Sequence, residues 1–191
     1  MSIRPLTLLI FSLAAFAILT ACRNRASELP AYDTVPRFTM TDSDGHTFDS
    51  TALKGKVWIA DFIYTNCPGP CPRMTSQMHK VQEQVKGEDD VRLVSFSVDP
   101  QRDTPAALND YAHHFGGPTP DWVFLTGAPE TVHLIAYNVF HTGDVIGNMD
   151  HSTKFVLVDK RGTIRGYYSS LEAEGIQSML RDVAALRKEA S

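Results

Sequence analysis

The chain has 191 residues, of which 43% are hydrophobic and 21% are charged. This composition is that of an ordinary globular protein and excludes a disordered or fibrous chain. Lysine and arginine total 18 against 22 aspartate and glutamate, which gives a formal net charge of −4, and neither sign forms a long run. The sequence therefore lacks the basic footprint of a nucleic-acid-binding protein. No segment repeats at a fixed period, so a repeat architecture is also excluded.

The chain begins with an apolar segment that we expect to be a secretory signal peptide. A single positive side chain, Arg4, precedes the apolar stretch from Leu6 to Ala21, which is shorter than the ~20 residues that a membrane-spanning helix needs. The segment ends Leu19-Thr20-Ala21-Cys22, which resembles the lipobox of bacterial lipoproteins. We therefore expect residues 1–21 to be removed, Cys22 to be lipidated, and the protein to lie in the oxidising, extracytoplasmic part of a bacterial envelope, anchored to a membrane. The alternative is a signal anchor in which Cys22 has no role.

A polar segment follows the predicted anchor. It contains two prolines and little periodicity, so we interpret residues 22–36 as the lipidated N-terminus and a tether. The folded domain is then expected to start near Arg37 and to occupy residues 37–191, which is long enough to form a single hydrophobic core.

Within this domain the apolar pattern predicts alternating strands and helices. Two short extended runs around Asp42-Ser43-Asp44-Gly45 predict an opening β-hairpin, and the β-branched and aromatic run from Lys56 to Tyr64 predicts a strand buried on both faces. The remaining elements are expected, in chain order, as a helix from Pro72 to about Gly87, a strand over Val91–Val98, a helix over Thr104–Phe115, a strand over Trp122–Leu125, a helix over Pro129–Val139, strands over Thr153–Val158 and Thr163–Tyr168, and a helix from about Glu172 to Lys188. This order predicts an α/β fold, a three-layer sandwich on a central mixed sheet.

Two cysteines carry the first chemical signal. With Cys22 lipidated, Cys67 and Cys71 are left to the domain and can pair only with each other. They lie where the buried strand passes into a helix, and because Pro72 disfavours the helical conformation at the residue before it, we expect Cys71 to be the helix N-cap. A thiol at a helix N-terminus is favoured as thiolate, which suits a redox pair and a metal ligand alike. A static disulfide is the alternative, although a bridge closing so small a loop would stabilise the fold little.

Three segments of the domain resemble the Sco/SenC family of copper-binding proteins. Residues 62–72 match the family's strand followed by the pattern CPxxCP, and Val98–Pro105 is close to its DPxRDTP segment. Asp150-His151-Ser152 stands just before a predicted strand, where the family places its third copper ligand. The resemblance covers nearly all of the domain and implies a thioredoxin-like fold.

The resemblance further implies that Cys67, Cys71 and His151 are the copper ligands. Two soft thiolates and one imidazole suit Cu(I), and another nitrogen or sulfur donor would also allow Cu(II). Structural zinc would need a fourth protein ligand. Met149, beside His151, is a weaker thioether candidate. The remaining histidines are expected to be solvated surface residues or to lie near a helix end, without a ligand role: His46, His79, His113, His114, His133 and His141.

Sco/SenC proteins assist assembly of the dinuclear copper centre (CuA) of cytochrome c oxidase. The resemblance therefore implies a membrane-anchored metallochaperone whose partners are the apo form of oxidase subunit II and an external thiol reductant. The alternative is a thiol-disulfide oxidoreductase that uses Cys67 and Cys71 to reduce an apo-oxidase subunit or another exported protein, and a redox or copper sensor is a third reading. A thioredoxin-type reductant would have one residue fewer between its cysteines, and a peroxiredoxin would have threonine where Tyr64 stands.

Overall fold

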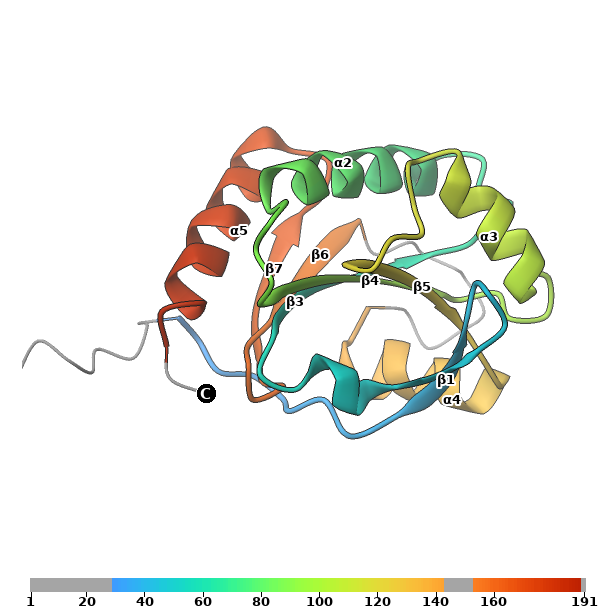
Figure 1. Ribbon diagram of the computed structural model, residues 1–191, viewed down its shortest axis with the longest axis horizontal. Helices are drawn as coiled ribbons and strands as arrows, with labels where there is room; N and C mark the ends of the chain where they lie inside the picture. Colours follow the sequence, from blue (N-terminus) through green and yellow to red (C-terminus); the bar gives the residue numbers. More distant parts are fainter. Residues whose placement is uncertain (1–28, 143–152, 190–191) are drawn as a thin grey trace, which may run out of the picture.

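Strands and helices alternate along the chain, and the elements can be followed by colour in Figure 1. The computed structural model describes residues 29–142 and 153–189. The strands are β1 (Thr39–Asp42), β2 (Thr47–Asp49), β3 (Val57–Ile63), β4 (Val91–Ser97), β5 (Trp122–Thr126), β6 (Lys154–Val158) and β7 (Ile164–Ser169). The helical segments are the 3₁₀ turn η1 (Ser50–Leu53), α2 (Pro70–Gln84), α3 (Pro105–His113), α4 (Pro129–His133), the π-helix η2 (Leu134–Val139) and α5 (Ala173–Leu186). The predicted order of elements is confirmed, except that the predicted helix over 129–139 changes from α to π geometry at Leu134.

The strands that the structure describes form one mixed sheet in the order β2-β1-β5-β4-β3-β6-β7. At its centre β3, β4 and β5 run parallel. The opening hairpin of β1 and β2 joins the β5 edge in antiparallel orientation, and β6 and β7 extend the opposite edge in the same way. The hairpin and the mixed sheet are therefore confirmed.

Helices cover both faces of this sheet (Figure 1). On one face, Met78 of α2, Leu108 of α3 and Met179 of α5 belong to a single core cluster. On the other face, Ile135 of η2 packs in a second cluster with the aromatic ring of Phe62. Every residue of β3 is buried, and alternate side chains divide between the two clusters, as expected of a strand covered on both sides. The three-layer sandwich is confirmed. None of the helices in the described part of the chain is long and apolar enough to cross a membrane.

The segment before β1 is bound to the domain from Leu29 onward. The backbone amides of Tyr32 and Val35 donate to carbonyl oxygens of β7 and of the turn before it, at 2.9 and 2.8 Å. Part of the segment predicted as a tether, from Leu29 to Val35, is therefore hydrogen-bonded to the domain. The segment has the composition of a linker, but its backbone groups find partners along β7, which a composition argument cannot detect.

A buried arginine joins this segment to the rest of the domain. Arg165 of β7 is 5% exposed, and its guanidinium donates to the carbonyl oxygens of Leu29 and Pro30 at 3.0 and 2.7 Å. The same group donates to the carboxylates of Asp159 and Glu189 at 3.0 and 3.1 Å. A planar guanidinium presents five N–H donors in a fixed fork, so one side chain holds acceptors from several segments at once. The N-terminal segment, the β6–β7 turn and the C-terminal end meet at this residue.

The substitution Arg165→Ala should lower the free energy of unfolding by about 3–5 kcal/mol, because it leaves the carboxylate of Asp159 buried without its cation. Arg161→Ala is the matched control. Arg161 approaches the same carboxylate at 3.7 Å, but its side chain is exposed, so its loss should cost less than about 1 kcal/mol. Urea denaturation followed by tryptophan fluorescence measures both values. Small and equal effects would mean that Arg165 does not hold the segment in place.

Candidate metal centre

The two cysteines lie where β3 passes into α2. Residues 64–69 make this connection, so Cys67 is in the loop and Cys71 is in the helix. Cys67 is 6% exposed and Cys71 is 0% exposed. Both thiols are free. The position at the carboxyl end of the parallel strands is the edge at which open α/β sheets place their ligands.

The helix α2 begins earlier than the sequence predicts. Gly69 is its N-cap and Pro70 its first residue, so Cys71 lies inside the first turn and the prediction that Cys71 is the N-cap is wrong. Backbone N–H groups in a first turn have no partner within the helix, so Pro70 and Pro72 are both tolerated there. The restriction that Pro72 places on Cys71 is a preference, and here the short connection from β3 overrides it.

As a result, the backbone N–H groups at the N-terminus of α2 point at the sulfur of Cys67 rather than at that of Cys71. The backbone amide of Cys71 donates to Cys67 Sγ at 3.4 Å. Burial alone would raise the pKa of Cys67, but hydrogen bonds from the Cys71 thiol and from the amides of Cys71 and Gly69 outweigh it, and the pKa is lowered. For Cys71, burial and then the hydrogen bond to Cys67 raise the pKa. The thiolate of this pair is therefore Cys67, where the sequence had favoured Cys71.

A buried carboxylate fixes the residue that starts the cysteine loop. Asp103, which is 0% exposed, accepts from the hydroxyl of Thr65 at 2.6 Å and from its amide at 3.2 Å. It also accepts from the hydroxyl of Ser97, at the end of β4, at 2.6 Å. The loop is thus tied to the neighbouring strand and to the segment before α3. This role of Asp103 is not visible in the sequence, because the carboxylate stands beside Thr104, the N-cap of α3, in an ordinary helix-start pattern.

Two of the predicted site residues, Cys22 and His151, lie outside the described residues, as does Met149. Their roles stay predictions. The described histidines have surroundings away from the cysteines: His141 Nε2 lies 2.8 Å from Asp33, His114 Nδ1 lies 2.6 Å from the carbonyl oxygen of Asp110, His133 stacks on Tyr137, and His79 packs against Gly116. His79 is half-buried, so it is not the solvated surface residue that was one of the two expectations for it.

The opening hairpin brings together Asp42, Asp44 and His46, whose possible ligand atoms lie within 4.8 Å of one another. One carboxylate oxygen of Asp42 already accepts from the backbone amides of Asp44 and His46, at 3.0 and 2.8 Å. This is the hydrogen bonding of an ordinary turn in which an aspartate accepts from the backbone ahead of it. The cluster is explained by the turn.

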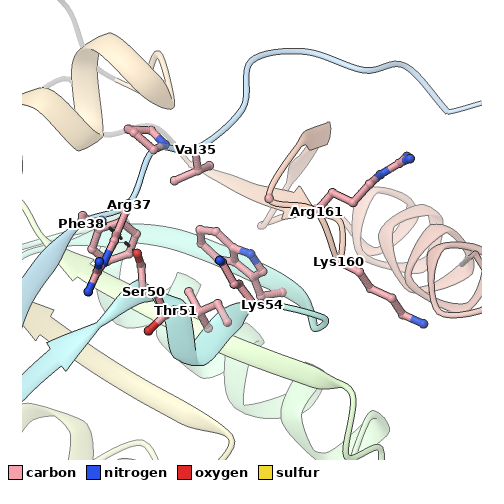
Figure 2. A pocket seen from close by; sticks show the side chains of 12 residues that line it. Val35, Arg37, Phe38, Ser50, Thr51, Lys54, Lys160 and Arg161 are labelled. Carbon is pink, nitrogen blue, oxygen red and sulfur yellow. Dashed lines mark hydrogen bonds between the residues drawn. The ribbon is translucent and has the colours of Figure 1, made fainter. Parts of the chain in front are cut away.

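A separate pocket of about 190 Å³ lies at the other end of β3 (Figure 2). Its lining comes from the N-terminal segment, η1, β3 and the β6–β7 turn, and contains neither cysteine nor histidine. Four cations line it, but Arg37 pairs with Asp49 and Lys160 donates to the carbonyl of Arg187. Figure 2 shows Lys160 and Arg161 extending away from the other lining side chains. This pocket is distinct from the cysteine site.

Comparisons with known proteins agree on one family. The SCO1/SenC family description matches residues 26–188. The structure is similar to that of a SCO1/SenC family lipoprotein from Bacillus anthracis (strain Ames), with 35% identity and a TM-score of 0.75 over 85% of this chain and 99% of the other. It is also similar to BsSco, a member of the Sco family of cytochrome c oxidase assembly proteins in which a disulfide switch is identified. The identity is 32% and the TM-score 0.73, over 86% of this chain and 98% of BsSco. It is also similar to copper-bound ScoI of Bradyrhizobium japonicum, with 25% identity and a TM-score of 0.66 over 81% and 99%.

The two thiols should differ in their rate of alkylation. In the reduced Cys71→Ser protein, the remaining Cys67 should react with iodoacetamide at neutral pH, because hydrogen bonds favour its thiolate. In the Cys67→Ser protein, the remaining Cys71 is buried and protonated, and its rate should be lower by at least about tenfold. Mass spectrometry of samples quenched over time measures both rates. A faster Cys71 would contradict the assignment of the thiolate.

Proposed function

Because this chain belongs to the SCO1/SenC family, we propose that it is a membrane-anchored copper-binding protein that serves the CuA centre of cytochrome c oxidase. Proteins of this family bind copper and act in cytochrome c oxidase assembly. For this chain, the proposal adds that the target is the CuA centre and that the protein is anchored to a membrane.

The observation that carries the proposal is the pair of sulfurs at the start of α2. The backbone amide of Cys71 donates to the Cys67 sulfur at 3.4 Å, and the two thiols are also hydrogen-bonded to each other. Soft thiolates are the ligands that Cu(I) prefers. His151 would supply the third donor as a neutral imidazole. The donor set fits copper, which we treat as the cargo of the protein.

Because the pKa is lowered for Cys67 and raised for Cys71, the two cysteines contribute to copper binding at different steps. Cys67, whose thiolate is favoured, makes the first contact, and Cys71 completes the site once it has lost its proton. Loading therefore releases protons and weakens at low pH. A disulfide between Cys67 and Cys71 would remove both donors, so an oxidised protein needs an external thiol reductant before it can load.

The same difference between the two thiol pKa values favours a second candidate function, that of a thiol-disulfide oxidoreductase. The Cys67 thiolate would attack a substrate disulfide, forming a mixed disulfide and releasing one substrate thiolate. The Cys71 sulfur would then attack Cys67, which forms the intramolecular disulfide and releases the second substrate thiolate. A nucleophile with a lowered pKa beside a buried resolving thiol is suited to this sequence. The disulfide switch of BsSco supports such redox chemistry in a relative.

The copper proposal predicts which substitutions abolish binding. Reduced protein should bind about one Cu(I), and Cys67→Ser or Cys71→Ser should abolish tight binding because a soft donor is lost. His151→Ala should weaken binding by about tenfold or more, equivalent to about 1.4 kcal/mol. His79→Ala and His133→Ala are the matched controls and should have little effect. Competition with a chromogenic Cu(I) chelator measures each affinity.

Full affinity in His151→Ala would remove this residue from the site. To separate the two candidate functions, copper-loaded protein is mixed with a pre-reduced CuA domain and with an oxidised one, and metal and free thiols are followed separately. Copper movement to the reduced domain supports the copper carrier. Thiol exchange with the oxidised domain, without copper movement to the reduced one, favours the oxidoreductase.

The proposed anchor is a lipid on Cys22, which would place the domain at a membrane of a bacterial envelope on its extracytoplasmic side. The proposal is supported by the sequence Leu19-Thr20-Ala21-Cys22 and by the similarity to a Bacillus anthracis lipoprotein. Because Leu29 is already bound to Arg165, the chain from Cys22 to Leu29 can span at most ~25 Å. The anchored domain would therefore stay close to the membrane surface.

Replacing Cys22 with serine should prevent acylation. The mature mass should then change by far more than one atom, and the membrane fractionation should change as well, because the lipid is lost. Intact-mass spectrometry and membrane fractionation of wild type and Cys22→Ser measure the two effects. If mass and fractionation stay the same, the lipoprotein assignment is wrong.

A further inference from the structure

The pocket at the start of β3 lies at the end of this strand opposite the cysteine loop, and four cations line it (Figure 2). No aspartate or glutamate is among its lining residues. Its apolar lining includes Trp58, which is 2% exposed. This end of the domain therefore presents cations around an apolar floor, and the proposed copper chemistry makes no use of it.

Two of the four cations have little compensating charge. Lys54 is exposed, and no carboxylate among the described residues forms an ion pair with it. The side chain of Arg161 is 63% exposed and lies 3.7 Å from Asp159. The same carboxylate oxygen already accepts from Arg165 at 3.0 Å, so its charge is paired inside the domain. Lys54 and Arg161 are therefore available to anionic groups from outside the domain.

The cations do not converge on one point. Figure 2 shows Arg37 on one side of the pocket and Lys160 and Arg161 on the other, with their charged ends directed apart. A single small anion is bound best by charged groups that meet around it, as in a bidentate clamp. Cations spread around a rim suit a surface that carries many anionic groups, such as a layer of lipid headgroups.

The chain that precedes the domain leads to this pocket. Val35 lines the pocket, and its amide donates to the carbonyl oxygen of Gly162, another lining residue, at 2.8 Å. Val35 follows Leu29 by at most about 20 Å of chain, and the proposed anchor at Cys22 precedes Leu29 by at most ~25 Å. An anchored domain therefore has the pocket within reach of the membrane surface.

We propose that the pocket end of the domain docks on anionic phospholipid headgroups of the membrane to which the chain is anchored. The inference rests on the proposed membrane anchor and adds the orientation of the domain. β3 runs from the pocket to the cysteine loop, and its seven residues span about 20 Å. Docking through the pocket directs the cysteine loop away from the bilayer, into the aqueous phase, where a partner domain can reach both sulfurs.

An acidic protein surface would offer the same charge as the headgroups. The tether favours the membrane, because a short anchored chain keeps the pocket at a high effective concentration of headgroups. Among the described residues, none of the contacts would hold a protein partner at this end of the domain in the same way.

The test compares the labelling of two exposed lysines in full-length protein inserted into preformed vesicles. Lys54 lines the pocket, and Lys80 lies on α2, which covers the other face of the sheet. An amine-reactive reagent and mass spectrometry give the labelling rate of each lysine on phosphatidylcholine vesicles with and without phosphatidylglycerol. Phosphatidylglycerol should slow the labelling of Lys54 by about fivefold or more and leave Lys80 unchanged. Raising the salt from about 0.1 M to about 1 M should remove this difference, because the Debye length falls to ~3 Å.

Two charge-reversal variants make the test specific to the pocket. Arg161→Glu should remove most of the protection of Lys54, because it reverses one of the two uncompensated charges. Lys80→Glu, the matched control, changes the net charge equally on the other face and should keep the protection. Equal protection in both variants, or equal Lys54 rates on the two kinds of vesicle, would overturn the proposal.

Two further results would identify a different occupant and so overturn the proposal. Protection of Lys54 by inorganic phosphate on phosphatidylcholine vesicles would indicate a soluble anion, and protection that rises with protein density would indicate a second copy of this chain. Flotation with phosphatidylcholine vesicles tests the anchor separately. Protein that does not float refutes the anchor and with it the tethered docking, whereas floating protein without protection of Lys54 refutes the docking alone.

Discussion

The hydrogen bond from the first turn of α2 to the sulfur of Cys67 sets the chemistry of the whole site. β3 is buried on both faces, so the chain leaves it beneath the helical layer and must turn into α2 within residues 64–69. This short turn directs the amide of Cys71 at Cys67. This amide has no acceptor within the helix, and its hydrogen bond together with the positive end of the helix favours an ionised sulfur there. Cys71 is held inside, where burial favours the protonated thiol.

Two buried carboxyl groups, those of Asp61 and Asp103, differ in their hydrogen bonding. Asp103 accepts from Thr65 and Ser97, so it ties the cysteine loop to the end of β4 and holds it in place. Asp61 has no comparable donors among the described residues, and burial raises its pKa to about 7.

Local sequence signals predict the parts of the fold that depend on local physics. The strand β3, the body of α2 and the Thr104-Pro105 start of α3 are predictable from the sequence, because burial, helical spacing and capping leave a pattern in adjacent residues. The place of the cysteine pair, between a buried strand and a helix, is predictable for the same reason. The identity of the thiolate is not predictable in this way, since it depends on the residue at which α2 begins.

The other features that the sequence does not predict depend on contacts between residues far apart in the chain. The polar segment from Leu29 is held by Arg165, more than a hundred positions away, and nothing within the segment signals this contact. Asp61 and Asp103 are both aspartates beside regular elements, and only the groups packed around them distinguish a paired carboxylate from an unpaired one. The proposed third ligand, His151, rests on the family motif and lies outside the described residues.

The central claim is that both cysteine sulfurs and one imidazole hold copper at the start of α2. X-ray absorption spectroscopy of the Cu(I)-loaded protein tests this claim most directly, because sulfur and nitrogen scatterers are distinguished in the first coordination shell. We expect two sulfur scatterers and one nitrogen in the wild type, and no tightly bound copper in Cys71→Ser. A wild-type first shell with no sulfur, or with one sulfur alone, would contradict this claim.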